Sequence, residues 1–354
     1  MSTLFTPLTL RDLTLRNRLW VSPMCQYSAV DGVPQDWHHT HLAQFASGGA
    51  GLVIAEATAV SPEGRISPED TGLWTDEQRD AWRPIVAAIR ARGAVAGVQL
   101  AHAGRKASTW SPFSGRRGSV DVADGGWQTV APSAVAFEGF APPDTLDLHG
   151  IDRVVADFAA AARRAVDAGF ELLEVHAAHG YLLHQFLSPL SNLREDEYGG
   201  TLENRARLLL RVVDAVTDAA PSVPLLVRFS ATDWADGGWD ADQTAVVAGW
   251  AAERGVDLFD ISSGGLVAHQ RITTGPGYQV EFAAHVRRVA GVPVSAVGMI
   301  DDSALAERVV AEGDADAVMS GREWLRDPHF GLRAAAELGA DISYWPRQYV
   351  RARL

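Results

Sequence analysis

Residues 151–181 read IDRVVADFAAAARRAVDAGFELLEVHAAHGY and predict, in order, a helix, a stop, a strand and a polar strand end. Apolar side chains recur at helical spacing as far as Ala168, and Gly169 follows as a typical helix end. Residues 170–176 form a nearly continuous apolar run, which is typical of a parallel strand covered on both faces. The fold can be predicted from this helix–strand unit.

The same unit recurs along the whole chain. The predicted strands are eight: Leu19–Met24, Gly51–Thr58, Ala94–Ala101, Phe170–His176, Pro224–Ser230, Val256–Ser262, Val292–Val297 and Ala315–Ser320. The helical patterns between them are Thr75–Arg92, Ile151–Ala168, Leu202–Ala219, Asp242–Arg254, Gln279–Ala290 and Ser303–Glu312. Such alternation predicts an α/β fold with a parallel sheet, and eight units close naturally into a (β/α)₈ TIM barrel. A doubly wound open sheet is the alternative.

Two segments lie outside this repeat. Residues from about 1 to 18 predict a hairpin lid over the barrel bottom, and residues from about 103 to 150, rich in Gly, Pro and Ser, predict an active-site cover. A length of 354 residues would suggest two domains at about 150 residues each. Barrels of this kind commonly exceed ~250 residues as one unit, so we predict a single domain over residues 1–354.

The composition excludes several classes of protein. Acidic side chains number 44 against 31 basic ones, for a net charge of −13, whereas nucleic-acid binding needs a basic surface. One cysteine excludes an intrachain disulfide, a cysteine-rich zinc site and a four-cysteine iron–sulfur cluster within one chain. The sequence has neither a secretory-signal pattern nor an apolar run that could span a bilayer. We expect a cytoplasmic protein without nucleic-acid or membrane partners.

Chemistry-bearing residues gather where the predicted strands end, which is where (β/α)₈ barrels carry their active sites. Gly298 and Gly321 follow the seventh and eighth strands, and Arg322 comes next. Glycines let backbone N–H groups approach a phosphate closely, so these residues predict a phosphate site. The alternative is that each glycine only makes a tight turn.

His176, His179 and Tyr181 lie within six positions at the end of the fourth strand. The two histidines could form a metal pair, but no carboxylate stands at a familiar spacing to complete a zinc site. They could instead donate two hydrogen bonds to one substrate oxygen, with the phenol delivering a proton to the α-carbon. The remaining alternative is two structural histidines and a core tyrosine.

Three further residues have a structural and a functional interpretation. Cys25 is either a buried small hydrophobe or part of a site after the first strand. Gln99 could be a hydrogen-bonded core residue or could supply a donor and an acceptor to a ring amide. Burying the charge of Arg228 in an apolar strand costs free energy unless the side chain faces an anion. The alternative is a structural ion pair with an acidic neighbour.

Together these residues resemble the Old Yellow Enzyme family of FMN-dependent ene-reductases, which are (β/α)₈ barrels. The similarity covers nearly the whole chain and is densest in five motifs: residues 22–25 (SPMC), 99–106 (QLAHAGRK), 176–182 (HAAHGYL), 186–192 (FLSPLSN) and 196–200 (DEYGG). Glu203-Asn204-Arg205 and Gly321-Arg322 extend it. Most classical members carry threonine where this chain has Cys25, and the cysteine resembles the thermophilic-like branch.

The resemblance implies a role for each candidate. The residues that would line the flavin are Ser22, Pro23, Met24, Cys25, Ala57, Gln99 and Arg228, and those that would hold its phosphate are Gly298, Gly321 and Arg322. Cys25 would tune the flavin potential, and Arg228 would lie near the N1/O2 end of the ring. The residues that would serve the substrate are His176 and His179 on its oxygen, Tyr181 as proton donor, Tyr27 in contact, and Lys106 nearby.

The resemblance also implies self-association into a dimer or tetramer. In the thermophilic-like branch an arginine near the C-terminus reaches into the neighbouring subunit's site, and Arg351 in Gln348-Tyr349-Val350-Arg351 matches it. The chain departs from that pattern afterwards, at residues 352–354.

The implied activity is that of an NADPH dehydrogenase, or 2-enoate-type ene-reductase, with xenobiotic reductases as relatives. NADPH or NADH would reduce FMN, and FMN N5 would pass the hydride to an α,β-unsaturated carbonyl or nitro compound in a ping-pong reaction without a metal. No G-x-G-x-x-G follows a predicted strand, which agrees with one shared pocket. The alternatives are a metal-dependent lyase or hydrolase with His176 and His179 as ligands, and a flavin-binding electron relay without enone turnover.

Overall fold

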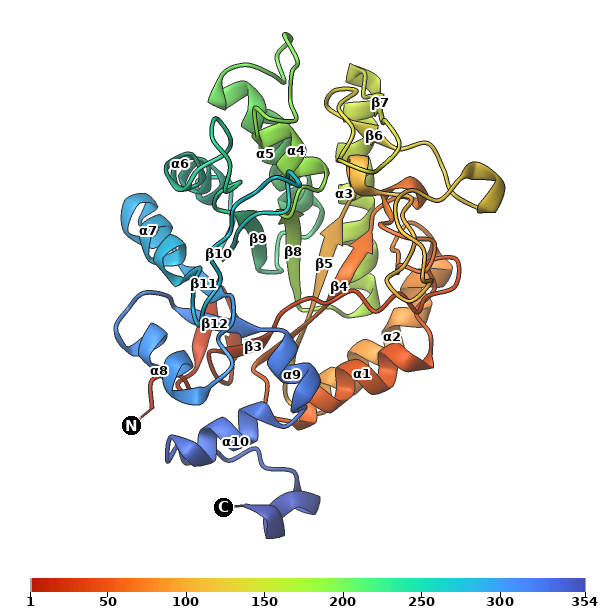
Figure 1. Ribbon diagram of the computed structural model, residues 1–354. Coiled ribbons are helices and arrows are strands. Elements are labelled where there is room, and N and C mark those ends of the chain that lie inside the picture. Colours follow the sequence, from red (N-terminus) through yellow and green to blue (C-terminus); the bar gives the residue numbers. More distant parts are fainter. Residues whose placement is uncertain (1, 354) are drawn as a thin grey trace.

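The computed structural model describes residues 2–353, and its eight parallel strands close into a barrel (Figure 1). Around the ring the strands are ordered β10, β11, β12, β3, β4, β5, β8 and β9, and β9 pairs with β10 to close it. Their bounds are β3 Leu19–Val21, β4 Leu52–Ala59, β5 Val95–Ala101, β8 Leu172–Ala177, β9 Leu225–Ser230, β10 Leu258–Ser262, β11 Val294–Val297 and β12 Ala317–Ser320. All eight predicted strands are confirmed, and the open-sheet alternative is wrong.

The helices surround the barrel. Six of them match the predicted segments: α2 Asp76–Arg90, α3 Leu148–Ala168, α5 Leu202–Ala219, α6 Ala241–Ala252, α7 Val280–Ala290 and α8 Ser303–Ala311. Four were not predicted: α1 Asp36–Ser47, α4 Leu182–Leu187, α9 Arg322–Arg326 and α10 Phe330–Glu337. The helix α1 contains three histidines among small and polar residues and gives a weak apolar period, and α4 and α9 are too short to show one. No helix in the described part of the chain is long and apolar enough to cross a membrane.

Alternate residues of each strand point into the barrel, and their character changes from one end to the other. At the bottom, Leu172 on β8, Leu226 on β9 and Leu258 on β10 belong to one buried apolar cluster with Trp20. Two residues further along the same strands stand Glu174, Arg228 and Asp260, and two further again His176, Ser230 and Ser262. The barrel interior therefore passes from an apolar floor through a charged layer to a polar mouth.

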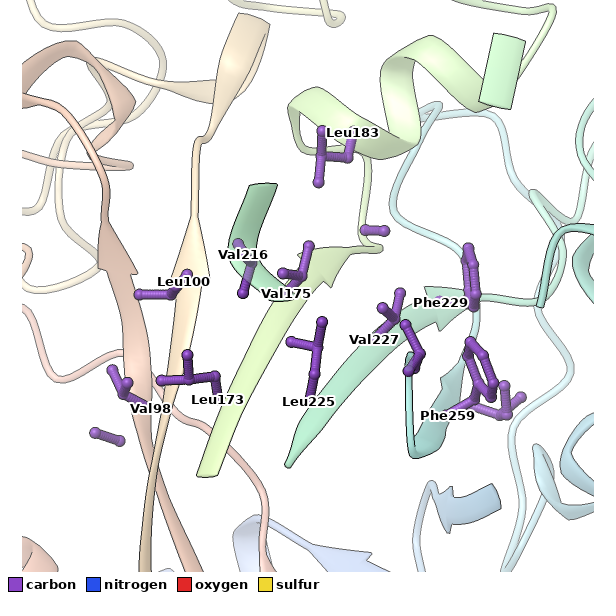
Figure 2. Close-up of a cluster of buried hydrophobic side chains, with 14 of the residues drawn as sticks. Val98, Leu100, Leu173, Val175, Leu183, Val216, Leu225, Val227, Phe229 and Phe259 are labelled. Atoms are coloured by element: carbon purple, nitrogen blue, oxygen red, sulfur yellow. The ribbon is translucent and has the colours of Figure 1, made fainter. Parts of the chain in front are cut away.

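The outward residues of the same strands are apolar and pack against the helices. Figure 2 shows Leu173 and Val175 of β8, with Leu225 and Val227 of β9, in one buried cluster that reaches Val216 of α5. This double burial explains why the strands appear as continuous apolar runs in the sequence. The charged inward residues are the interruptions in those runs.

A hairpin covers the barrel floor. The strands β1 Leu8–Leu10 and β2 Leu13–Leu15 pair antiparallel, and Leu10 and Leu15 are buried in the floor cluster. The hairpin is tied to the barrel by Arg11, whose guanidinium pairs with Asp257 at 2.8 Å just before β10. It closes the end of the barrel opposite the polar mouth.

Most boundaries lie within two residues of the predicted ones, and two differ by three residues. The first barrel strand ends at Val21 rather than Met24, because Pro23 has no N–H to continue the ladder. The helix α3 begins at Leu148 rather than Ile151, because the side chain of Asp147 accepts the N–H of Gly150 at 2.6 Å and caps it.

The segment before α3, predicted as a cover, contains short elements. These are the 3₁₀ turns η2 Gly104–Lys106 and η3 Val122–Asp124 and the two-residue strands β6 Val130–Ala131 and β7 Asp144–Thr145. The segment touches the mouth of the barrel, where the ring of Phe113 packs edge to face on Tyr27 with 6.0 Å between centres.

The hairpin should contribute to global stability. Leu15 is fully buried on the floor cluster, so Leu15→Ala should lower the free energy of unfolding by about 2–5 kcal/mol through lost burial and a residual cavity. Urea denaturation followed by tryptophan fluorescence measures this. Thr14→Ala on the exposed side of the same strand is the matched control and should change stability by less than about 0.5 kcal/mol. Equal losses in the two variants would contradict this packing role.

Candidate active site

A buried charged layer lies directly beneath the mouth of the barrel. Nε of Arg228 lies 2.9 Å from Oδ2 of Asp260, so the ion pair that was the alternative interpretation of Arg228 is present. Arg228 also donates through Nη1 to the hydroxyl of Ser22 at 3.0 Å, and Ser295 donates to Asp260 at 3.1 Å. On the other side of the layer, Nε2 of Gln99 donates to Oε1 of Glu174 at 2.7 Å.

The layer contains one guanidinium and two carboxyl groups, and both carboxyl side chains are 0% exposed. The pKa of Glu174 is raised to about 8, mainly by burial and then by the charge of Asp260, against the opposing effects of Arg228 and of the hydrogen bond from Gln99. Burial also raises the pKa of Asp260. Because Asp260 is the carboxyl in contact with the guanidinium of Arg228, we assign the negative charge to it. With Glu174 protonated, the layer is neutral.

His176, His179 and Tyr181 converge above this layer, as the sequence spacing predicted. The His176 ring centre lies 5.1 Å from that of His179 and 5.0 Å from that of Tyr181, both in edge-on arrangements. Arg228 is the direct cross-strand partner of His176 in the parallel ladder. The three rings therefore face one another at the end of β8.

The hydrogen bonds of the two histidines indicate where their protons lie. Nδ1 of His176 accepts the backbone N–H of Ala178 at 3.3 Å, so its proton is on Nε2, which is left to donate. Nε2 of His179 lies 2.8 Å from the hydroxyl of Ser262. If that hydroxyl donates, as the network allows, the His179 proton is on Nδ1. Each ring then keeps one N–H that has no hydrogen-bond partner among residues 2–353.

Burial keeps the site neutral at pH 7. It lowers the pKa of His176 and of His179 well below the usual value, and the charge of Arg228 lowers both further. It raises the pKa of Tyr181 and of Cys25 well above their usual values. The imidazoles are therefore neutral donors, the phenol keeps its proton, and the cysteine is a thiol rather than a thiolate.

The backbone of His179 is held in the left-handed region, at φ 58°, by two side chains. Its N–H donates to the hydroxyl of Ser230 at 2.9 Å, and its carbonyl accepts from Nζ of Lys106 at 2.8 Å. Lys106 also donates to the carbonyl of Gly265 at 2.9 Å, and its ammonium lies 5.1 Å from the centre of the Tyr181 ring. A non-glycine residue persists in this conformation only with such support.

The next residue of the turn, Gly180, is held by α4. Its N–H donates to Nδ1 of His184 at 2.9 Å, and its carbonyl accepts from Nε2 of Gln185 at 2.7 Å. Nε2 of His184 lies 2.9 Å from Oδ1 of Asp233, and both side chains are fully buried. A Cβ on Gly180 would lie 2.2 Å from the carbonyl oxygen of Gly265, so only glycine fits here.

The segment after β3 is anchored from below by a buried carboxylate. The N–H of Gln26 donates to Oε2 of Glu56 on β4 at 2.9 Å, and Oε1 of Glu56 lies 3.1 Å from Nε2 of His38. Tyr27 follows at φ 49°, which turns the chain toward the mouth. Cys25 is partly buried at the start of this turn.

A cavity of about 230 Å³ lies beside the mouth, between the ends of β3, β10, β11 and β12. Its lining includes Ser22, Met24, Ser262, Gly298, Gly321 and Arg322. A Cβ on Gly298, which has φ 126°, would lie 2.6 Å from Nε2 of Gln279. Within residues 2–353 no carboxylate lies in ion-pair contact with Arg322, whereas Arg326 takes up both acidic neighbours, Asp301 and Glu323.

This cavity fits a phosphate group, because a free guanidinium and two glycine backbones face it. The residues expected at the flavin ring surround the same mouth: Ala57 pairs in register with Gln99, and Pro23 and Met24 lie in the loop after Ser22. Arg351 is not brought to this site. It lies exposed in the 3₁₀ turn η4 Arg347–Ala352, beyond α10 and away from the loops above β8 and β9 (Figure 1).

Fold and site together define a (β/α)₈ oxidoreductase barrel of the Old Yellow Enzyme type. Residues 3–341 match the model of the NADH:flavin oxidoreductase / NADH oxidase family, and the chain belongs to that family. Its cofactors are therefore FMN and a nicotinamide dinucleotide. This excludes the metal-dependent lyase as the class of enzyme, and in the described residues no group of three or more His, Cys, Asp or Glu could hold a metal ion.

The relatives support this identification. The chain is 47% identical over 355 residues to the NADPH dehydrogenase of Listeria innocua, with 99% of each chain covered. It is 45% identical to the NADPH dehydrogenase of Bacillus subtilis, with 98% of each covered. Among solved structures, morphinone reductase matches with a TM-score of 0.79 at 32% identity, covering 96% of this chain and 91% of the other. The old yellow enzyme homologue of Zymomonas mobilis has the same TM-score at 29% identity, covering 99% and 98%.

Apart from Lys106, which the resemblance placed near the substrate, sequence reasoning did not identify the residues that support the site. The charged residues Glu174 and Asp260 interrupt apolar strand runs in the same way as Arg228, so the signal that found Arg228 could have found them. The contacts of Lys106 and Ser230 with the turn carry no comparable sequence signal, because they join segments that are distant along the chain. The contact of His184 is local, four residues from Gly180, and depends on the shape of the turn.

The phosphate cavity makes a testable prediction. Arg322→Ala should raise the dissociation constant for FMN by about tenfold to a hundredfold, because hydrogen bonds to a charged group contribute ~1.5–3 kcal/mol. Fluorescence titration of the flavin-free protein measures this. Riboflavin, which lacks the phosphate, should bind wild type and variant equally. A variant that loses affinity for both ligands alike would contradict a phosphate-specific role.

Proposed function

We propose that this protein is an FMN-dependent ene-reductase that reduces the C=C bond of α,β-unsaturated carbonyl compounds, and of nitroalkenes by the same geometry, with NADPH or NADH as donor in a ping-pong reaction. The observation that carries this proposal is the pair of neutral histidine donors beside a protonated phenol, above the Gln99–Arg228 layer. FMN reduced by the nicotinamide supplies the hydride for the β-carbon. The chain's own residues bind the substrate, polarise its oxygen and protonate its α-carbon.

His176 and His179 bind the substrate oxygen. Two N–H donors aimed at one carbonyl stabilise the negative charge that develops there when the β-carbon accepts a hydride. Their neutrality matters, because a neutral donor polarises the oxygen without transferring its own proton. Since their pKa values are lowered by burial, this state persists through the neutral pH range.

Tyr181 donates the proton to the α-carbon. Its pKa is raised by burial, so the phenol is protonated at neutral pH, and its ring packs against that of His176. The ammonium of Lys106, over the same ring, would stabilise the phenolate left after transfer. Tyr27, held beside the mouth by Phe113, is positioned to contact the substrate.

FMN would be held by the residues around the mouth. The residues that would line the flavin edge are Ser22, Pro23, Met24 and Cys25, those that would lie at the ring are Ala57 and Gln99, and Arg228 would lie near the N1/O2 end. The phosphate would be held by Gly298, Gly321 and Arg322. The cysteine at position 25, where most classical members carry threonine, supports membership of the thermophilic-like branch. Arg351, exposed on η4, is available to a neighbouring subunit in a homo-oligomer.

Tyr181→Phe tests the proton donor. The rate of flavin reoxidation by cyclohexenone should fall by about 10²- to 10⁴-fold, the usual contribution of a general acid, while flavin reduction by the nicotinamide is spared. Stopped-flow absorbance of the flavin resolves the two half-reactions. Equal loss in both would refute the assignment, and an enzyme that never turned over enones would instead be an electron relay.

His176→Ala tests the oxygen site. Loss of one donor should raise the apparent dissociation constant of cyclohexenone by about tenfold, since a neutral hydrogen bond contributes ~0.5–1.5 kcal/mol, and should slow reoxidation as well. The saturation dependence of the reoxidation rate on enone concentration measures both effects. An unchanged apparent dissociation constant for cyclohexenone would show that His176 does not bind the oxygen.

A further inference from the structure

The proposed chemistry leaves one buried ionisable group unused. Glu174 stands in the barrel interior, fully buried, with a single hydrogen bond, from Gln99 to its Oε1. Its Oε2 is buried and, among the described residues, has no hydrogen-bond partner. A carboxyl so placed carries a free-energy cost that the fold alone does not explain.

Charge counting shows which carboxyl carries a proton. Asp260 lies 2.9 Å from the guanidinium of Arg228 and accepts a further hydrogen bond from Ser295. Glu174 has neither contact. Two ionised carboxylates with one cation would leave a net negative charge buried without solvent, which is expensive. Glu174 is therefore the group whose charge responds to its surroundings.

The charged layer is connected to the flavin site. Arg228 donates to Ser22, which lines the cavity beside the mouth, and Gln99, expected at the flavin ring, is hydrogen-bonded to Glu174 itself. The charged and titratable groups that face Glu174 are Arg228 on β9, Asp260 on β10 and, two residues along its own strand, His176. Since His176 is neutral, a new charge on the flavin has few other groups to act on.

We propose that Glu174 is a redox-linked proton acceptor: in the alkaline range, where its carboxyl is ionised while the flavin is oxidised, it takes up one proton from solvent when the flavin is reduced and releases it on reoxidation. Reduction adds two electrons and one proton to FMN and leaves one negative charge on the ring. The additional proton converts the Glu174 carboxylate to the acid, so the layer beneath the ring becomes neutral. This rests on the proposed placement of the flavin ring beside Gln99 and Arg228.

Linkage gives the expected pH dependence. The negative flavin raises the pKa of Glu174, and by reciprocity the proton on Glu174 favours reduction by the same free energy. Below the pKa of about 8 Glu174 is already protonated, and reduction takes up one proton per two electrons. From about pH 8 up to the higher pKa of the reduced state, it takes up two. Each tenfold rise in proton affinity corresponds to ~30 mV for a two-electron couple.

The test is the midpoint potential of the FMN-loaded protein as a function of pH, measured with redox dyes and no alkene. Wild type should show a steeper slope above about pH 8, matching two protons per two electrons. Glu174→Gln, neutral at every pH, should show the single-proton slope throughout and a higher potential than wild type in the alkaline range. Glu171→Gln is the matched control, because it makes the same change just before β8 at the surface, beside Arg90, and should behave like wild type.

A wild-type slope of one proton per two electrons at every pH overturns the proposal, and so does a steep region that survives in Glu174→Gln. If that variant does not bind FMN, infrared difference spectra of wild type at alkaline pH decide, because reduction should produce a new protonated-carboxyl band there; its absence overturns the proposal. Failure of alkene reduction would refute the proposed function but leave these potentials unaffected, so the two outcomes are distinguishable.

Discussion

The ion pair between Arg228 and Asp260 inside the barrel is the interaction on which the geometry of the mouth depends. Removing either partner alone would leave an uncompensated buried charge, so each fixes the other in place. Through Ser22 the pair also fixes the start of the loop that carries Cys25 and Tyr27. Because the direct cross-strand partner of Arg228 is His176, the same pair lies immediately beneath the residues proposed to bind the substrate.

Above this layer, the positions of the site residues are fixed by hydrogen bonds to their backbone rather than by side-chain packing. Both polar backbone groups of His179 and of Gly180 are bonded to side chains from other segments, namely Ser230 on β9, Lys106 in the cover segment, and His184 and Gln185 on α4. Such a turn cannot shift without breaking several hydrogen bonds at once. Reactions that depend on near-attack geometry lose rate with displacements of about 1 Å, so this support serves the chemistry directly.

The strands could be predicted because their outward packing makes them nearly continuous apolar runs in the sequence. The candidate site residues could be predicted because they follow those runs directly. His176, His179 and Tyr181 are neighbours in sequence and therefore in space. The floor hairpin also lies where its sequence placed it. The helix α1 and the short helices were missed because helical periodicity needs several turns of contrasting residues. The support of the turn by Lys106 and Ser230 was missed because it joins segments distant in sequence. Three statements stay predictions: that the chain forms one domain, that it belongs to the thermophilic-like branch, and that it forms a homo-oligomer.

The two parts of the mouth differ in how their charged groups are paired. At the ring site Arg228 is paired with Asp260, the imidazoles are neutral, and Tyr181 and Cys25 keep their protons, so the charge that appears on Tyr181 during reaction meets the ammonium of Lys106. In the phosphate cavity, Asp301 and Glu323 also line the wall but pair with Arg326, and Arg322 makes no ion pair within the described residues. In a chain of net charge −13, a dinucleotide or mononucleotide is repelled at long range. One unpaired guanidinium at the cavity, where water is displaced and the field is less screened, supplies the local attraction that the protein as a whole lacks.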